Sequence, residues 1–148
     1  IKMAVTIEKA LELIYTNTKP KSLKIIPIEN ALGYILAEGI VASHNLPAFD
    51  NSAMDGYAVK IEDSAKVVSV KETIFAGDDF RGELFHGEAI KIMTGAKIPL
   101  GTQAVVPIED ITCEQDGIQL PDNLIMSKHI RFAGEDIKKE VLLVKGIQ

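Results

Sequence analysis

The sequence predicts a mixed α+β protein in which β-structure dominates, and three observations lead to this prediction. An apolar pattern with helical spacing occurs near the N-terminus. The middle of the chain consists of short β-rich runs separated by glycine-containing turns. Asp116-Gly117 joins two such runs, and an Asp-Gly pair in this setting is a strong signal for a β-hairpin. The chain has 148 residues, 47% of them hydrophobic, which suffices for a sizeable core.

A helix is the first predicted element, and Thr6 is expected to cap its N-terminus. Asn17 and Pro20 are expected to end the helix. The following stretch predicts a short helical turn at 29–32. It then predicts an apolar strand or helix over 34–41, which we expect to pack against the first helix. The apolar residues that recur at helical spacing are Ile7, Ala10, Leu11 and Ile14.

The middle of the chain predicts a separate domain that interrupts another one. Residues 51–128 are expected to form a small, β-barrel-like inserted domain. Residues 1–50 and 129–148 are expected to form a discontinuous, helix-containing N-terminal module around it. The apolar C-terminal strand has no predicted helix to cover it, which indicates a fragment, a tight oligomer or both. The strands predicted inside the inserted domain cover 58–60, 65–75 and 88–95, followed by the hairpin.

Composition narrows the class of function. Acidic residues outnumber basic ones, 21 to 16, and the net charge of −5 argues against a nucleic-acid partner. No apolar run approaches the ~20 residues that span a bilayer, and the N-terminus lacks the shape of a signal peptide. We therefore expect a soluble, cytoplasmic protein with no membrane partner. Cys113 is the one cysteine, and the three histidines are scattered, so no disulfide or zinc site is predicted.

Three loops combine glycine with small polar or acidic residues. Glycine lets the backbone approach a ligand closely and present its N–H groups. Each loop also has a plain explanation as a structural turn, and from the pattern alone this explanation is the stronger one. The loops are DNSAMDGY at 50–57, MTGAKIP at 93–99 and GEDI at 134–137.

Chemical roles for these loops follow from the residue types. Thr94-Gly95 would offer a hydroxyl and an amide to an oxyanion. Asp55, Glu135 and Asp136 would offer carboxylates to Mg²⁺, which prefers one or two carboxylates together with waters and substrate phosphates. No nucleophile–base pair or phosphate-loop spacing accompanies them.

Three blocks of sequence resemble one known family, in the order that the family has them. They are LPAFDNSAMDGYAV at 46–59, IKIMTGAKIPLGTQAVVPIED at 90–110 and IRFAGEDIKK at 130–139. The chain is similar in these blocks to the molybdopterin molybdenumtransferases, the MoeA and gephyrin E-domain family. The N-terminal helix and ALGYILAEGIVA at 31–42 fit the same pattern, so that the resemblance covers nearly the whole chain.

The resemblance implies a function in molybdenum cofactor biosynthesis. The family inserts molybdate into adenylylated molybdopterin with release of AMP, assisted by Mg²⁺. Its members are homodimers with an elongated N-terminal module and an inserted β-domain. In the family, an α/β domain that holds most of the pterin follows this region, and we expect this chain to lack it. The chain is therefore expected to supply the dimer-facing side of the active site and to be inactive alone. Another candidate partner is the protein that adenylylates the pterin.

The resemblance also assigns roles to residues. Asp50 receives a supporting role only. The residues implied as catalytic are Asp55, Thr94 and Asp136; as substrate-binding, Asn51, Ser52, Gly95 and Arg131; and as Mg²⁺ ligands, Asp55 and Asp136.

One departure from the family and two alternative functions complete this interpretation. The family has a glycine in a KKGE pattern where this chain runs directly through Lys139-Glu140, which puts the local turn in doubt. A non-catalytic dimerisation or scaffold module would tolerate loss of Asp55 and Asp136 and would depend on apolar interface residues such as Phe49 and Tyr57. A β-domain that binds a sugar or an organophosphate is a third alternative.

Overall fold

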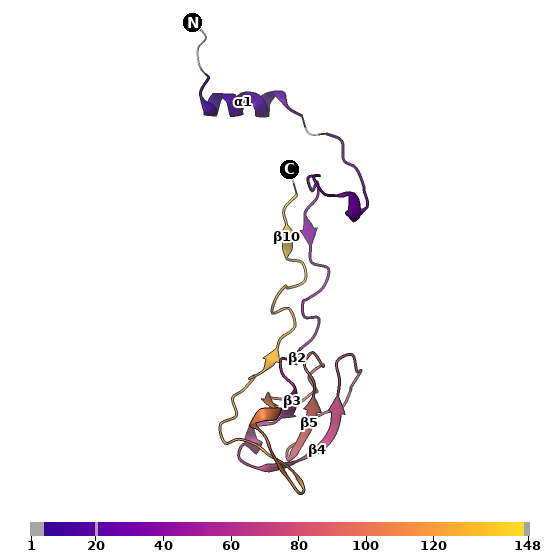
Figure 1. The fold of residues 1–148 in the computed structure, drawn as a ribbon, viewed down its shortest axis with the longest axis vertical. Coiled ribbons are helices and arrows are strands. Elements are labelled where there is room, and N and C mark those ends of the chain that lie inside the picture. The colour runs from indigo at the N-terminus through magenta and orange to yellow at the C-terminus, as the bar shows by residue number, and fades with distance from the viewer. Residues whose placement is uncertain (1–4, 20, 147–148) are drawn as a thin grey trace. The chain divides into compact units, whose positions relative to one another are not determined.

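The chain consists of two compact units in the computed structural model, which describes residues 5–19 and 21–146 (Figure 1). One unit contains the chain up to Gly39 together with the segment from Lys145 onward. The other unit is the continuous stretch Ile40–Val144. The predicted boundaries after residues 50 and 128 stay predictions, because this division concerns compactness alone.

In its described residues, the N-terminal unit contains one α-helix, α1, at Ile7–Asn17. The Thr6 side chain accepts a hydrogen bond from the Lys9 amide at 3.2 Å, which confirms the predicted N-cap. The helix ends after Asn17 as predicted, and Pro20 lies outside the described residues. A 3₁₀ turn, η1, follows at Ile28–Asn30, close to the predicted helical turn.

The expectation for residues 34–41 was wrong. Only Ile40–Val41 is a strand, β1, and it pairs antiparallel with β10 at Leu142–Val144. Residues 34–39 contain no helix or strand, and no residue of α1 is buried. The apolar pattern over-predicted an element here because apolar side chains form one only where a partner surface covers them.

The second unit begins and ends with two chain segments that run antiparallel. After β1 and β10, the segments meet again at a bridge between Leu46 and Ile137. They meet once more where β2, Asn51–Ser52, pairs with β9, Ile130–Arg131. These two antiparallel segments lead to the larger sheet. They contain two of the three predicted loops, those at 50–57 and 134–137.

A curled, six-stranded sheet forms the rest of the second unit and confirms the β-rich fold class (Figure 1). Its strand order is β6-β3-β5-β4-β8-β7, and β4 and β5 run parallel while the other neighbours are antiparallel. The predicted hairpin is present as β7 and β8. The strands are β3 (Gly56–Val59), β4 (Val67–Ile74), β5 (Glu88–Ile92), β6 (Ala104–Pro107), β7 (Thr112–Glu114) and β8 (Gly117–Gln119), with 3₁₀ turns η2 (Ile61–Asp63) and η3 (Ile108–Asp110) between them.

The sheet has two apolar clusters because alternate side chains of its strands point to opposite faces. In β3, Tyr57 and Val59 belong to one cluster, and Ala58 belongs to the other. The first cluster also contains Val68, Ala89, Ala104, Val106, Ile118 and Leu120; the second contains Ile74, Leu84, Ile90, Ile92, Ala96 and Val105. Since all four residues of β3 are buried, the segment that follows Asp55 is fixed at the centre of the fold.

Glycine is required at the start of β3, where this strand approaches β6 very closely. A Cβ atom on Gly56 would lie 2.1 Å from the carbonyl oxygen of Val106, a backbone atom that cannot rotate away. The Asp55-Gly56 pair of the first loop is therefore set by strand packing as well as by turn formation.

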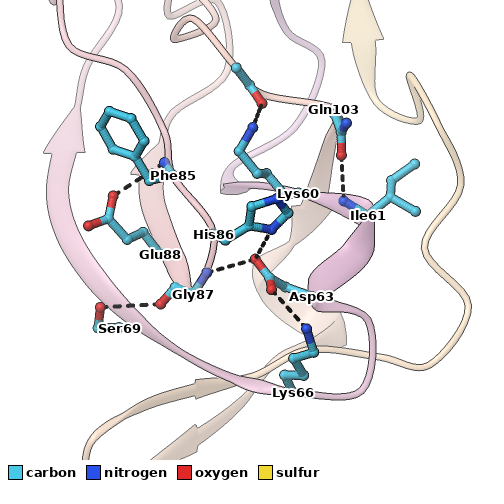
Figure 2. Close-up of polar contacts among 11 residues, drawn as sticks. Lys60, Ile61, Asp63, Lys66, Ser69, Phe85, His86, Gly87, Glu88 and Gln103 are labelled. Atoms are coloured by element: carbon cyan, nitrogen blue, oxygen red, sulfur yellow. Dashed lines mark hydrogen bonds and ion pairs between the residues drawn. The ribbon is translucent and has the colours of Figure 1, made fainter.

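A buried aspartate, Asp63, connects η2 to the turn that precedes β5 (Figure 2). Asp63 is 2% exposed, and its carboxylate accepts hydrogen bonds from the Gly87 amide at 2.9 Å and from Lys66 at 3.2 Å. His86 lies 3.8 Å away. Burial raises the pKa of Asp63, but the bonds from Gly87 and Lys66 outweigh it and hold the pKa below its ordinary value. We interpret this cluster as structural, because it ties η2 to the turn before β5.

The departure from the family pattern at Lys139-Glu140 has a visible consequence. Glu140 adopts a left-handed backbone conformation with φ of 70°, which favours glycine. Its amide donates to the Ala42 carbonyl oxygen at 2.8 Å, so that the turn is closed as a glycine would close it. The turn therefore forms without the glycine, and Glu140 adopts a backbone conformation that is unfavourable for a residue with a side chain.

Candidate functional site

The three predicted loops meet at strand β2. On one side, the Ser52 amide donates to the Ala96 carbonyl oxygen at 3.0 Å, and the Gly95 amide donates to the Ser52 carbonyl oxygen at 2.8 Å. On the other side, Asn51 and Ser52 pair with β9. A two-residue strand thus joins the 93–99 loop to the segment that enters the 134–137 loop.

Asp55 and Thr94 are in direct contact. The Oδ1 atom of Asp55 accepts two hydrogen bonds from Thr94, one from the amide and one from the hydroxyl, both at 2.7 Å. Both residues are exposed, and they are 39 positions apart in the sequence. The contact forms because Asp55 precedes β3 and Thr94 follows β5, and these strands are antiparallel neighbours.

This contact determines the charge of Asp55. The bond from the Thr94 amide and then the bond from its hydroxyl hold the pKa of Asp55 below the ordinary value, against a small opposing effect of desolvation. The carboxylate is ionised at neutral pH. Its Oδ2 atom accepts no hydrogen bond from the residues that the structure describes, so one oxygen is left for a ligand.

Arg131 and Asp136 form a second pair. The Nη2 atom of Arg131 donates to both carboxylate oxygens of Asp136, at 2.7 and 2.6 Å. The hydrogen bond to Asp136 and its charge hold the pKa of Arg131 above the ordinary value. Arg131 ends β9, and the turn that brings Asp136 back is closed by a bond from the Phe132 amide to the Glu135 side chain. Asp136 is therefore already ion-paired with Arg131 of the same chain.

The remaining predicted residues are less accessible to a ligand. Asn51 and Ser52 are 7% and 1% exposed, and the Ser52 hydroxyl donates to the Met54 carbonyl oxygen at 2.6 Å. The donors of the 93–99 loop are also engaged, those of Thr94 by Asp55 and the Gly95 amide by Ser52. To hold an oxyanion, these groups would have to exchange an existing bond for a new one. Their substrate-binding roles stay predictions.

The two pairs are held on neighbouring loops but are not bonded to each other. Within residues 5–19 and 21–146, no hydrogen bond or ion pair joins Asp55 or Thr94 to Arg131 or Asp136. In that same part of the chain, no group of three or more His, Cys, Asp or Glu side chains converges on a possible metal position. Asp55 fits Mg²⁺ as a single ligand through Oδ2, whereas both oxygens of Asp136 already face Arg131.

One cleft of the second unit lies elsewhere. It measures about 290 Å³ and lies between β6 and the 121–129 segment. None of the predicted site residues lines it. Asp55, Thr94 and Asp136 instead lie exposed on loops, whereas Asn51 and Ser52 are buried in β2.

Sequence reasoning missed the main role of Asp50. Its Oδ1 atom accepts a hydrogen bond from the Ala133 amide at 2.8 Å, across 83 positions of sequence. The carbonyl oxygen of Asp50 accepts another bond from the Ile98 amide at 2.9 Å. A local signal existed, since aspartate side chains commonly bond backbone amides in turns. No pattern could indicate that the amide belongs to another loop.

Comparison with known proteins places the chain in a family. Residues 5–148 match the family described as the MoeA N-terminal region (domain I and II). The chain is 41% identical over 133 residues to a molybdopterin molybdenumtransferase of Haemophilus influenzae, covering 87% of this chain and 33% of the relative. It is 35% identical over 154 residues to the Bacillus subtilis protein of that name, covering 96% and 36%.

A solved structure gives the same result for the fold. The molybdopterin biosynthesis MoeA protein of Pyrococcus horikoshii matches with a TM-score of 0.78 and 34% identity, covering 97% of this chain and 38% of that one. The chain therefore belongs to the MoeA N-terminal region family. It spans about a third of the length of the curated relatives that it matches. In the described part of the chain, no helix has the length and apolar character needed to cross a membrane.

Proposed function

We propose that this chain forms part of a molybdopterin molybdenumtransferase, which inserts molybdate into adenylylated molybdopterin and releases AMP. The observation that carries the proposal is the convergence of the three family blocks at β2, which holds the Asp55–Thr94 and Arg131–Asp136 pairs on exposed loops. The relatives with this name extend well beyond the matched region. The activity is therefore proposed for a complete enzyme, meaning a polypeptide of the relatives' length that contains this region.

In such an enzyme this region supplies positioned charges. Asp55 stays ionised because Thr94 donates twice to its Oδ1 atom, and Oδ2 remains available. Arg131 keeps its positive charge and is aimed by Asp136. Preorganised charges of this kind hold an anionic substrate in place and need no rearrangement during the reaction. A carboxylate alone would repel molybdate, which is why a cation belongs to the proposal.

Mg²⁺ is proposed as the cofactor, with Asp55 as its ligand from this chain. A bound Mg²⁺ would neutralise charge between the carboxylate and the anionic substrate. Asp136 would join it only after leaving Arg131. If removal of Mg²⁺ with EDTA left the activity of the complete enzyme unchanged, the cation would have no place in the site.

A homodimer located in the cytoplasm completes the proposal, with the protein that adenylylates the pterin as a further partner. The two charged pairs are exposed on loops, which is consistent with a site completed by another subunit or domain. Exposed apolar side chains favour assembly as well: Ile7, Leu11 and Ile14 of α1 are 46–76% exposed. The same observation supports the second candidate, a non-catalytic dimerisation or scaffold module.

The experiment that separates the two candidates is molybdate-dependent AMP release by the complete enzyme. Asp55→Asn keeps the shape of the side chain and removes its charge. The enzyme proposal predicts at least a tenfold loss of kcat/KM with an unchanged oligomeric state. Full activity of Asp55→Asn, or no AMP release by the wild type, would favour the scaffold.

A further inference from the structure

We propose that Asp50 is a positioning residue that locks the Thr94 loop and the Arg131–Asp136 loop into one arrangement. This inference rests on the proposed function, because the arrangement matters only if these loops form a site. It starts from the two contacts of Asp50, which involve two different parts of the residue. The carboxylate holds the Ala133 amide at 2.8 Å, and the backbone carbonyl holds the Ile98 amide at 2.9 Å.

The Ala133 contact acts on the Arg131–Asp136 pair. Ala133 lies between the two members of the pair, at the top of the turn that reverses the chain. Neighbouring bonds tie the rest of that turn to the same segment, from the Gly134 amide to the Pro47 carbonyl oxygen at 2.9 Å, for example. The Asp50 carboxylate is the one side chain among the described residues that bonds this turn from outside it. Without that bond, the pairing of Arg131 with Asn51 and the bond from Gly134 to Pro47 would remain, but the Ala133 amide between them would lose its partner.

The Ile98 contact acts on the Thr94 loop. Ile98 follows Gly95 and Ala96, whose backbone groups bond Ser52. Asp50 therefore extends the β2 pairing by one residue toward the end of that loop. Because one residue makes both contacts, a displacement of either loop must break one of the two bonds, rotate the Asp50 side chain or displace the other loop.

This role needs a hydrogen-bond acceptor at position 50 and does not need a charge. An asparagine side chain presents a carbonyl oxygen at the position of Oδ1, so that Asp50→Asn can keep the Ala133 bond. Asp50→Ala removes the acceptor. A metal ligand or an acid–base group at position 50 would behave differently, because it would lose its function in both variants.

The test uses AMP release by the complete enzyme with both variants and a matched control. Glu88→Ala is the control, because the Glu88 carboxylate also accepts from a backbone amide, that of Phe85 at 3.3 Å, at the opposite end of β5 from Thr94. We expect Asp50→Ala to lower kcat at least tenfold, and Asp50→Asn to stay within threefold of the wild type. Glu88→Ala should stay within twofold, with thermal unfolding of every variant above the assay temperature.

Either of two kinetic results would overturn the inference. Activity of Asp50→Ala within twofold of the wild type would show that the loops need no lock. A loss in Asp50→Asn as large as in Asp50→Ala would show that the charge matters instead. If Asp50→Ala does not fold, the Asn variant alone decides, since tenfold loss contradicts positioning and near-wild-type activity supports it.

Amide hydrogen exchange in the 148-residue chain separates this inference from the proposed function, because it requires no catalysis. The Ala133 amide should be protected in the wild type and in Asp50→Asn, and should exchange at least tenfold faster in Asp50→Ala. Unchanged Ala133 exchange in Asp50→Ala would refute the lock. If the exchange result holds while the wild-type enzyme releases no AMP, the proposed function fails and the lock stands as a structural device.

Discussion

Replacing Gly56 by alanine should destabilise the second unit strongly. The added Cβ would lie 2.1 Å from the Val106 carbonyl oxygen and 2.9 Å from its carbonyl carbon. Non-bonded heavy atoms settle at about 3.5 Å, so β3 and β6 would have to separate by more than about 1 Å. Such a shift stretches hydrogen bonds beyond their useful range, including that from the Ile108 amide to the Asp55 carbonyl oxygen, now 3.1 Å. Two lost bonds at about 1 kcal/mol each, with about 1–3 kcal/mol of overpacking, give a loss of roughly 3 kcal/mol or more.

Urea unfolding followed by far-UV circular dichroism measures this loss in the 148-residue chain. With a typical denaturant slope, the midpoint should fall by about 1–3 M. Gly87→Ala is the control, because Gly87 has a positive φ of 76° but no heavy atom within 4 Å of the place that an added methyl group would take, and it should cost only about 1–2 kcal/mol. A loss in Gly56→Ala no larger than that in Gly87→Ala would refute the steric argument, because the added methyl group would then meet no serious clash at Gly56.

Three further changes test other parts of the structure. Thr94→Val removes one of two bonds to Asp55, so the Asp55 pKa should rise toward its ordinary value. In the wild type, the ionised Asp55 carboxylate contributes stability above the unfolded pKa of about 3.9, and this contribution is lost as the pH falls through the lower folded pKa. The pKa is measured by an NMR titration of the Asp55 carboxyl carbon. A pKa in Thr94→Val equal to that of the wild type would contradict the expected rise. Glu140→Gly relieves a left-handed residue and should raise stability by about 0.5–1 kcal/mol, seen as a higher melting temperature; a lower one would show that Glu140 is not strained. Asp63→Ala should cost about 2 kcal/mol because the Gly87 amide and Lys66 lose their buried partner, and a loss below about 0.5 kcal/mol in urea unfolding would mean that water replaces the carboxylate.

The acidic residues of the first loop have separate explanations in the structure. Asp50 bonds the backbone of a loop 83 positions away, and Asp55 receives both donors of Thr94. A carboxylate accepts several hydrogen bonds at once, so it can join loops that carry no regular pairing of their own. This explains why acids occur among apolar residues such as Phe49 and Met54. Asp55 differs from Asp50 in that the proposed function also gives its second carboxylate oxygen a ligand.

Much of the fold was determined by local features of the sequence. The Thr6 cap and the end of α1 follow from residues within one or two helical turns. The β7–β8 hairpin follows from a turn sequence between two short β-rich runs. The three sequence blocks indicate the family, because their residues are specific enough to be recognised without a structure. These features share one property, which is that their causes lie close together along the chain.

The tertiary structure alone decided which groups meet. Asp55 reaches Thr94 because β3 and β5 are neighbours, and Asp50 reaches Ala133 because two distant segments run antiparallel. It also decided that residues 34–39 form no strand, since an apolar run becomes an element only where another surface buries it. Pairing across long sequence separations depends on the packing of the whole unit, and a local pattern carries no information about its partner.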